Sequence, residues 1–312
     1  MIRTIVRRAG WTVVVVWFAV TATFLVTIAI PADPARALVG PHGTAEALDR
    51  VRAHYCLDRG MVGQYGCWIA RVARGDLGES YRSKRAVAEI IADRVWPTAQ
   101  LALAAIALQL ALGVPLGLVS ATRRGSWLDG GVHVASSIAQ SVPAFVAGTV
   151  LLYVAAYRWG WFPIGGYGAG GWDRLAHLVL PAMTLASVGT AYYARLVRAE
   201  LIDVLREDYV RTARAKGLPE RIVIGRHALR NALGPIVTLV GLDLGVLLGG
   251  AVVIEVIFAW PGLGRELLQA ILELDIPLIL GVAMVSACAI AVANLIVDVV
   301  QLWLDPRLRD PT

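Results

Sequence analysis

The sequence predicts an all-α integral membrane protein with six transmembrane helices and both termini in the cytoplasm. Of its 312 residues 57% are hydrophobic and only 17% are charged, and its mean hydropathy is +0.65. A soluble domain carries about 25% charged residues. Six runs are apolar over the ~20 residues that a helix needs to cross a bilayer, and helices satisfy their own backbone hydrogen bonds there. These runs are residues 9–30, 97–121, 130–157, 175–194, 231–254 and 276–297.

The arginines and lysines orient these six spans. If the N-terminus is inside, the inner segments hold 16 of them and the two short outer loops hold 3. The other basic residues lie in the first loop, residues 31–96, which is too long to influence orientation. Both termini are therefore predicted to be cytoplasmic. The net charge of +6 then belongs to the inner face and does not indicate a nucleic-acid partner.

Three parts of the chain are expected. Residues 1–96 form an N-terminal transmembrane helix with an extracytoplasmic loop, residues 97–304 the main transmembrane domain, and residues 305–312 a cytoplasmic tail. Arg7, Arg8 and the string "ARA" at 35–37 resemble a signal peptide with its cleavage site. However, 22 apolar residues exceed the usual hydrophobic region of about 7–15, which favours a retained helix.

The three cysteines do not suggest a metal site. Cys56 and Cys67 both fall in the outer loop, where a disulfide would persist. Without geometry, a disulfide and two free thiols are equally consistent with the sequence. Cys288 is expected to be a small packing residue. The chain has no C-x-x-C, no G-x-x-x-x-G-K-[ST] and no H-E-x-x-H or G-x-S-x-G, so we expect no cofactor, no metal and no catalytic residue.

A basic segment separates the fourth and fifth spans, "EDYVRTARAKGLPERIVIGRHALRN" at 207–231. Apolar residues recur at helical spacing from Val197 to Ala213. Gly217 can end that helix in a left-handed conformation, and Pro219 suits the first turn of the next one. The pattern predicts two helices joined by a tight turn. It fits a loop lying on lipid headgroups and a docking element for a cytoplasmic partner equally well.

The wording "DYVRTARAKGL…RHALRNAL" resembles the cytoplasmic E-A-A loop of bacterial ABC-importer permeases, in the oligopeptide/dipeptide/nickel branch of that family. Further strings follow in the family's order: "IPADP", "GDLGES", "GVPLGL", "SVPAF", "WGWFPIGG", "LPAMTLA", "EVIFAWPGLG", "LDIPLILG" and "DPRLR". The general E-A-A pattern itself matches only at Ala213, Gly217 and Leu229, and Arg211 stands in place of its glutamate.

This resemblance implies a type I ABC-importer permease in the bacterial cell (inner or plasma) membrane. It implies transport of dipeptides or oligopeptides, with nickel or another small solute as the alternative. The implied partners are a second homologous permease, cytoplasmic ABC ATPase subunits and an extracytoplasmic solute-binding protein. The implied ATPase-coupling residues are Asp208, Tyr209, Arg211, Thr212, Ala213, Ala215, Lys216 and Gly217.

Polar residues inside the spans are further candidates. Asp243 lies in the fifth span, where a charge costs about 2.5–3.5 kcal/mol, so it either lines the translocation path or makes a buried contact with the second permease. Glu255 either belongs to the path or its gate, or holds the gate helix by a hydrogen bond. Pro261 and Gly262 break the chain at the outer face and are assigned to the gate.

Glycines in the fifth span predict a helix contact, and carboxylates in the spans raise the alternative of a proton-coupled mechanism. Gly241, Gly245 and Gly249 form G-x-x-x-G pairs, which predict a close helix contact. Asp298 in the sixth span, with Asp243 and Glu255, could also relay protons in a secondary transporter. The lack of an inverted repeat disfavours that mechanism, and the lack of a nucleophile or metal motif disfavours an intramembrane enzyme.

Overall fold

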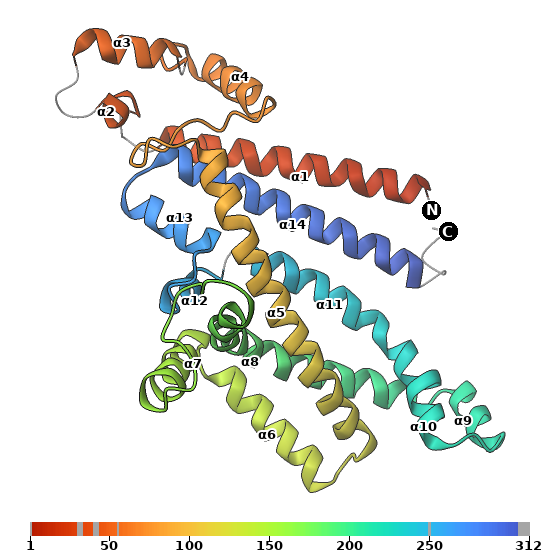
Figure 1. Cartoon of the computed structure of the whole chain (residues 1–312). Coiled ribbons are helices and arrows are strands. Elements are labelled where there is room, and N and C mark those ends of the chain that lie inside the picture. Colours follow the sequence, from red (N-terminus) through yellow and green to blue (C-terminus); the bar gives the residue numbers. More distant parts are fainter. Residues whose placement is uncertain (1, 30–33, 40–43, 55, 249–250, 305–312) are drawn as a thin grey trace.

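The computed structural model describes residues 2–29, 34–39, 44–54, 56–248 and 251–304, so the expected tail at 305–312 lies outside the described residues. The described chain is helical, with an isolated antiparallel bridge between Glu79 and Ala86 (Figure 1). The elements are α1 (Ile2–Ala29), α2 (Pro34–Val39), α3 (Ala45–His54), α4 (Met61–Val72), α5 (Val87–Thr122), α6 (Trp127–Ser141), α7 (Ala144–Leu151), η1 (Leu152–Arg158), α8 (Gly171–Val204), α9 (Asp208–Ala215), α10 (Glu220–Ile222), η2 (Val223–Leu229), α11 (Arg230–Leu248), α12 (Val252–Ile257), α13 (Leu263–Leu272) and α14 (Ile276–Leu304).

Four helices are long and apolar enough to cross a membrane, and two bent pairs raise the number to as many as six. The four lie within α1, α5, α8 and α14. The bent pairs are α6 with α7–η1, at 97°, and Glu220–Ala232 with Gly234–Leu248, at 49°, the second bend falling within α11. This agrees with the predicted all-α, six-span architecture. The predicted second span is the later part of α5, which begins ten residues earlier and runs through Pro97 without ending.

α5 and α8 form the closely packed centre of the molecule (Figure 1). A methyl group built on Gly113 would lie 2.7 Å from the Cβ of Tyr193, and one on Gly117 would lie 2.7 Å from the Cβ of Val197. These two glycines are spaced G-x-x-x-G, which lets two helix backbones approach each other. This glycine pair was not predicted from the sequence.

The predicted glycine contact on the fifth span is made with the last helix of the same chain. Gly241 abuts Val297 of α14, and a methyl group on Gly245 would lie 3.3 Å from Ile290. Gly249 lies outside the described residues. α11 is thus a contact helix within this subunit.

The ends of the helices sort into two sets. The start of α1, the end of α14, and α9 with α10 lie toward one end of the bundle, on the right of Figure 1. α2, α3, α4, α12 and α13 lie toward the other end. This is the arrangement that the charge-derived topology requires, with the basic segment on the side of both termini.

Candidate functional site

The basic segment folds back on itself through a small apolar cluster. α9 begins at Asp208, and its first acidic residue complements the positive end of the helix. Val210 and Ala213 are 0% and 6% exposed and pack against Val223 of η2. Val204 at the end of α8 completes the cluster. α9 is therefore fixed by its apolar side, and its polar side faces outward.

The turn after α9 has the predicted form. Gly217 has φ +74°, in the left-handed region, and its N–H donates to the carbonyl of Arg214 at 2.9 Å. Pro219 follows and precedes α10. Across the turn, Arg214 donates from Nη2 to Oε1 of Glu220 at 2.7 Å and from Nε to Oε2 at 3.2 Å. A planar guanidinium and a carboxylate paired in this way fix the mutual orientation of α9 and α10.

The structure separates the implied coupling residues into two groups. Ala213 is buried against the chain's own apolar cluster. The E-A-A pattern could not separate buried from exposed positions, because it does not show which side of the helix a residue occupies. The remaining implied residues are exposed: Asp208, Tyr209, Arg211, Thr212, Ala215, Lys216 and Gly217.

One further residue holds this segment and escaped the sequence analysis. Asn231, at the start of α11, donates from Nδ2 to the hydroxyl of Tyr209 at 2.9 Å. Asn231 also donates to the carbonyl of His227 at 2.8 Å. The segment is thus connected to the membrane helices at both ends, by α8 and by α11.

A second polar network joins three helices beside the basic segment. Arg198 of α8 donates two hydrogen bonds to Asp129 near the start of α6, from Nε at 2.7 Å and from Nη2 at 2.9 Å. Ser120 of α5 donates to the same carboxylate at 2.5 Å, and the N–H of Gly125 does so at 2.9 Å. The network therefore fastens the α5–α6 turn to the helix that continues into α9.

At the other end of the molecule, Glu255 is the centre of the turn between α12 and α13. Its side chain is 0% exposed. Thr98 of α5 donates to Oε1 at 2.8 Å, and the N–H of Arg265 in α13 donates to Oε2 at 2.8 Å. Thr98 in turn accepts from the N–H of Leu263 at 2.8 Å. Of the two roles considered for Glu255, this geometry favours the one that holds the helix.

Pro261 and Gly262 occupy the bend that Glu255 holds. A side chain at Gly262 would collide with the carboxylate of Glu255, so the bend requires glycine for lack of space. Trp260 is 0% exposed and donates from Nε1 to the carbonyl of Pro97 at 2.9 Å. The string "EVIFAWPGLG" therefore forms one buried turn attached to α5.

The strings "GDLGES" and "LDIP" meet in space. Asp275, just before α14, is 2% exposed and accepts from the Ser80 hydroxyl at 2.5 Å. It also accepts from the backbone N–H groups of Tyr81 at 3.1 Å and Arg82 at 3.4 Å. Arg82 pairs with Glu273 as well. The loop before α5 is fixed to the start of α14 by these contacts, across almost 200 residues of sequence.

Asp243 lies between helices of this chain. It is half-buried on α11. Tyr193 of α8 packs in one apolar cluster with Leu239 and Val240 of α11, and its buried hydroxyl makes no hydrogen bond within the described residues. Of the relay residues considered, Glu255 is engaged as described above, and the side chain of Asp298 lies outside the described residues.

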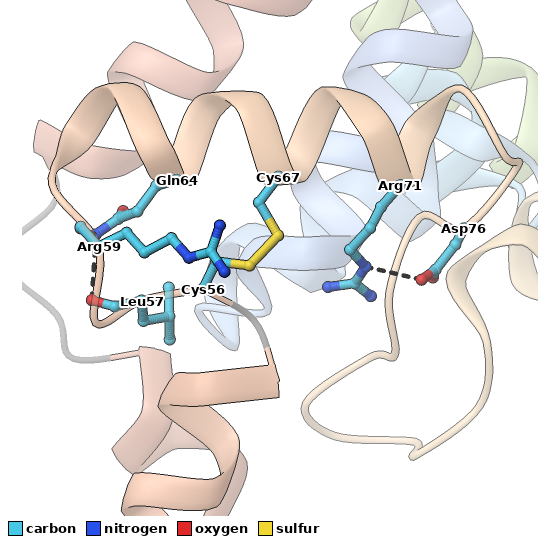
Figure 2. The surroundings of a disulfide bond; sticks show 7 residues. All are labelled: Cys56, Leu57, Arg59, Gln64, Cys67, Arg71 and Asp76. Atoms are coloured by element: carbon cyan, nitrogen blue, oxygen red, sulfur yellow. Dashed lines mark hydrogen bonds and ion pairs between the residues drawn. A yellow bond between two sulfur atoms is a disulfide. The ribbon is translucent and has the colours of Figure 1, made fainter.

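The outer loop contains a disulfide between Cys56 and Cys67, with Cα atoms 6.4 Å apart (Figure 2). It attaches the segment after α3 to the middle of α4. α4 also packs on α1, where the rings of Tyr65 and Trp68 lie 5.2 and 5.3 Å from the ring of Phe24. The loop is thus a small folded unit attached to the outer end of the first helix.

Comparison with known proteins covers nearly the whole chain. A family model described as "Binding-protein-dependent transport system inner membrane component" matches residues 113–310. A companion model for the N-terminal part, "Binding-prot-dependent transport system membrane comp, N-term", matches residues 1–102.

Two curated relatives match over their full length. A protein of Brucella abortus (strain 2308) named "Putative peptide transport system permease protein" is 38% identical over 310 residues, 98% of each chain. The glutathione transport system permease protein GsiC of Escherichia coli (strain K12) is 36% identical over 309 residues, 99% of each chain.

A solved structure shares the fold. It is titled "Inward facing conformations of the MetNI methionine ABC transporter", and the match covers 69% of this chain and 96% of that one with a TM-score of 0.54. Sequence identity is 18%, so this likeness concerns the fold alone.

Proposed function

The chain belongs to the binding-protein-dependent transport system inner membrane components, and we propose that it forms a translocation path for short peptides together with a second, related permease. Family membership makes it a multi-pass permease subunit of an ABC importer in the inner membrane, without a catalytic role. An ATPase and a solute-binding protein are the partners that this family implies.

The observation that carries the peptide proposal is the pair of full-length relatives. One is named for peptide transport and the other for glutathione, which is itself a tripeptide. Both matches include the N-terminal extension as well as the main transmembrane domain. A solute with peptide bonds is therefore the substrate class that this chain is proposed to share with them.

We assign the exposed side of α9 and the turn at Gly217 to the ATPase contact. The apolar cluster around Val210 and Val223 supports the segment from below, and the pair Arg214–Glu220 keeps the turn in one shape. Because the segment keeps its shape, a movement of the docked ATPase would displace α8 and α11 and would not deform the segment. For Asp243 we keep two proposed roles, lining the translocation path or making a buried contact with the second permease, because a charge in a span must be accommodated by one of them.

Selection of the solute rests with the solute-binding protein, so titrating that protein tests the proposal. The purified cognate protein would be titrated with a dipeptide, a tripeptide, glutathione and Ni²⁺ by calorimetry. Binding of at least one peptide with a Kd near or below ~1 μM supports the proposal, since that affinity corresponds to about −8 kcal/mol. Binding of Ni²⁺ alone, or of a solute without peptide bonds, would replace peptide by the alternative substrate.

A further inference from the structure

The exposed surface of α6 is divided into a polar half and an apolar half. His133, Ser137, Gln140 and Ser141 are all exposed and follow one another at i, i+4, i+7 and i+8, so they form one stripe along the helix. We call these four residues the α6 polar stripe. The buried residues Asp129 and Ser136 border this stripe, and Nε2 of His133 lies 3.9 Å from Oδ1 of Asp129, one turn away.

Apolar side chains occupy the neighbouring part of the exposed surface. Trp127, Val134 and Ile138 are 83%, 61% and 61% exposed. They lie on the side of the helix adjacent to the α6 polar stripe, as their spacing requires. α6 therefore offers two chemically different surfaces, although both are open in this subunit.

The helices α1 and α5 differ from α6 in this respect. From Gly10 to Ile28, the exposed residues of α1 for which burial is described are apolar. From Leu101 to Val119, the exposed residues of α5 are apolar as well. Such surfaces suit contact with lipid. The α6 polar stripe does not, because a polar group turned toward hydrocarbon loses its hydrogen bonds with water.

The stripe runs along most of α6. Ser137 follows the start of α6 by ten residues, which at 1.5 Å per residue is ~15 Å along the helix, a length equal to about half of the hydrocarbon core. Gln140 and Ser141 lie further along. Beyond the 97° bend, Thr149, Tyr153 and Tyr157 repeat the i, i+4, i+8 pattern with exposed side chains on α7 and η1.

We infer that the α6 polar stripe lines the translocation path and exchanges hydrogen bonds with the peptide groups of a passing solute. This inference rests on the proposed function. The Ser137 hydroxyl and the Gln140 carboxamide both donate and accept, so they suit the N–H and C=O groups of any peptide. The Ser141 hydroxyl donates to the carbonyl of Ser137 at 2.8 Å and can accept from a peptide N–H. Ser137, Gln140 and Ser141 carry no charge that would hold one end of a zwitterionic peptide and delay its release.

The connection of α6 to the coupling segment favours a path over a static subunit contact. Asp129, at the cytoplasmic end of the stripe, is bound to Arg198 of α8 by two hydrogen bonds. α8 continues into α9, the proposed ATPase contact. A helix that lines the path and is tied to this segment would change its position with the state of the ATPase, as alternating access requires.

Cysteine labelling of the assembled transporter tests the inference. Single cysteines would be placed at Ser137 and Gln140, with Val134→Cys and Ile138→Cys as matched controls from the apolar half, all in a Cys288→Ser background. The probe is a membrane-impermeant, charged maleimide, applied to membranes without nucleotide and after vanadate trapping. Because the thiolate needs water to form, Ser137→Cys and Gln140→Cys should react at least ~10-fold faster than the controls in one of the two states.

Two outcomes would overturn the inference. Equally slow reaction at all four positions in both states would place the stripe against lipid or protein. Fast reaction in the isolated subunit that disappears in both states of the assembled transporter would make the stripe a contact with the second permease. Labelling does not depend on the solute, so the two proposals can fail separately. If Ser137→Cys and Gln140→Cys react fast but the solute-binding protein binds no peptide, the stripe still lines the path and only the peptide function is rejected.

Discussion

Arg198 and Asp129 connect the cytoplasmic ends of α8 and α6 through two hydrogen bonds of 2.7 and 2.9 Å. The two residues are 69 positions apart in the sequence and lie on different membrane helices. Ser120 and Gly125 donate to the same carboxylate, so Asp129 is a junction of α5, α6 and α8. This junction provides a direct route from the proposed ATPase contact to the helix that carries the α6 polar stripe.

Replacing Arg198 should therefore uncouple transport from ATP hydrolysis. Arg198→Lys keeps the charge but cannot form the paired hydrogen bonds. Site-to-site coupling typically amounts to a factor of ~5 or more, so solute uptake per ATP hydrolysed should fall roughly fivefold or more. Uptake and phosphate release would be measured in the same proteoliposomes. The control is Arg124→Lys, which changes an exposed arginine in the nearby turn. If Arg198→Lys leaves the ratio of uptake to ATP hydrolysis unchanged, the junction plays no part in coupling.

Loss of the Glu255 carboxylate should open the outer turn. Glu255→Ala leaves the Thr98 hydroxyl and the N–H of Arg265 without their acceptor, at a cost of about 1–3 kcal/mol for each buried group. Thermal unfolding and hydrogen exchange of residues 255–266 would both be measured. We expect a lower Tm and faster exchange in this segment. The control Glu89→Ala, at a carboxylate that is 65% exposed, should change neither the Tm nor the exchange rate. If Glu255→Ala also changes neither, the Glu255 carboxylate does not hold the turn.

Gly217 should tolerate asparagine but not valine. Its φ of +74° costs a residue with a Cβ atom about 1–2 kcal/mol, whereas asparagine adopts this conformation more readily. No neighbouring atom would contact an added methyl group, so the effect comes from the backbone alone. Gly217→Val is expected to lower ATPase binding and uptake, measured by co-purification and transport, while Gly217→Asn stays near the parent protein. Equal effects of the two variants would contradict this explanation.

The outer loop should lose stability when Cys56 and Cys67 are separated. A disulfide closing a loop of this size contributes roughly 2–4 kcal/mol by restricting the unfolded loop. The double variant Cys56→Ser/Cys67→Ser should be cleaved faster by trypsin within residues 44–74, while the membrane helices stay protected. Peptide mapping without reductant checks the bond itself, and two free thiols in the native protein would remove it from the structure.

Local patterns were sufficient to predict the helices and the turn in the basic segment. Apolar runs predict helices because each peptide group is satisfied within its own span. The left-handed Gly217 was predictable because its cause lies in adjacent residues. The junction of Arg198 with Asp129, and the contact of Asp275 with Ser80, could not be derived from the sequence, because their partners are separated by 69 and 195 positions.

Residue type alone also could not show the surroundings of two residues. Glu255 was considered for the path or its gate, or for holding the gate helix, and the structure shows its carboxylate bonded to Thr98 and to the N–H of Arg265 in α13. Ala213 was grouped with its exposed neighbours because the family pattern has no information about which side of the helix a position occupies. Only the packing against Val223 shows that it faces inward.

Uptake of a labelled dipeptide into proteoliposomes tests the proposed function most directly. The proteoliposomes would contain this chain, its partner permease, the ATPase subunits and the solute-binding protein. We predict uptake that requires ATP and is abolished when the phosphate-loop lysine of the ATPase is replaced. Uptake that continues without ATP and follows an imposed proton gradient would contradict the proposed function and favour a secondary transporter.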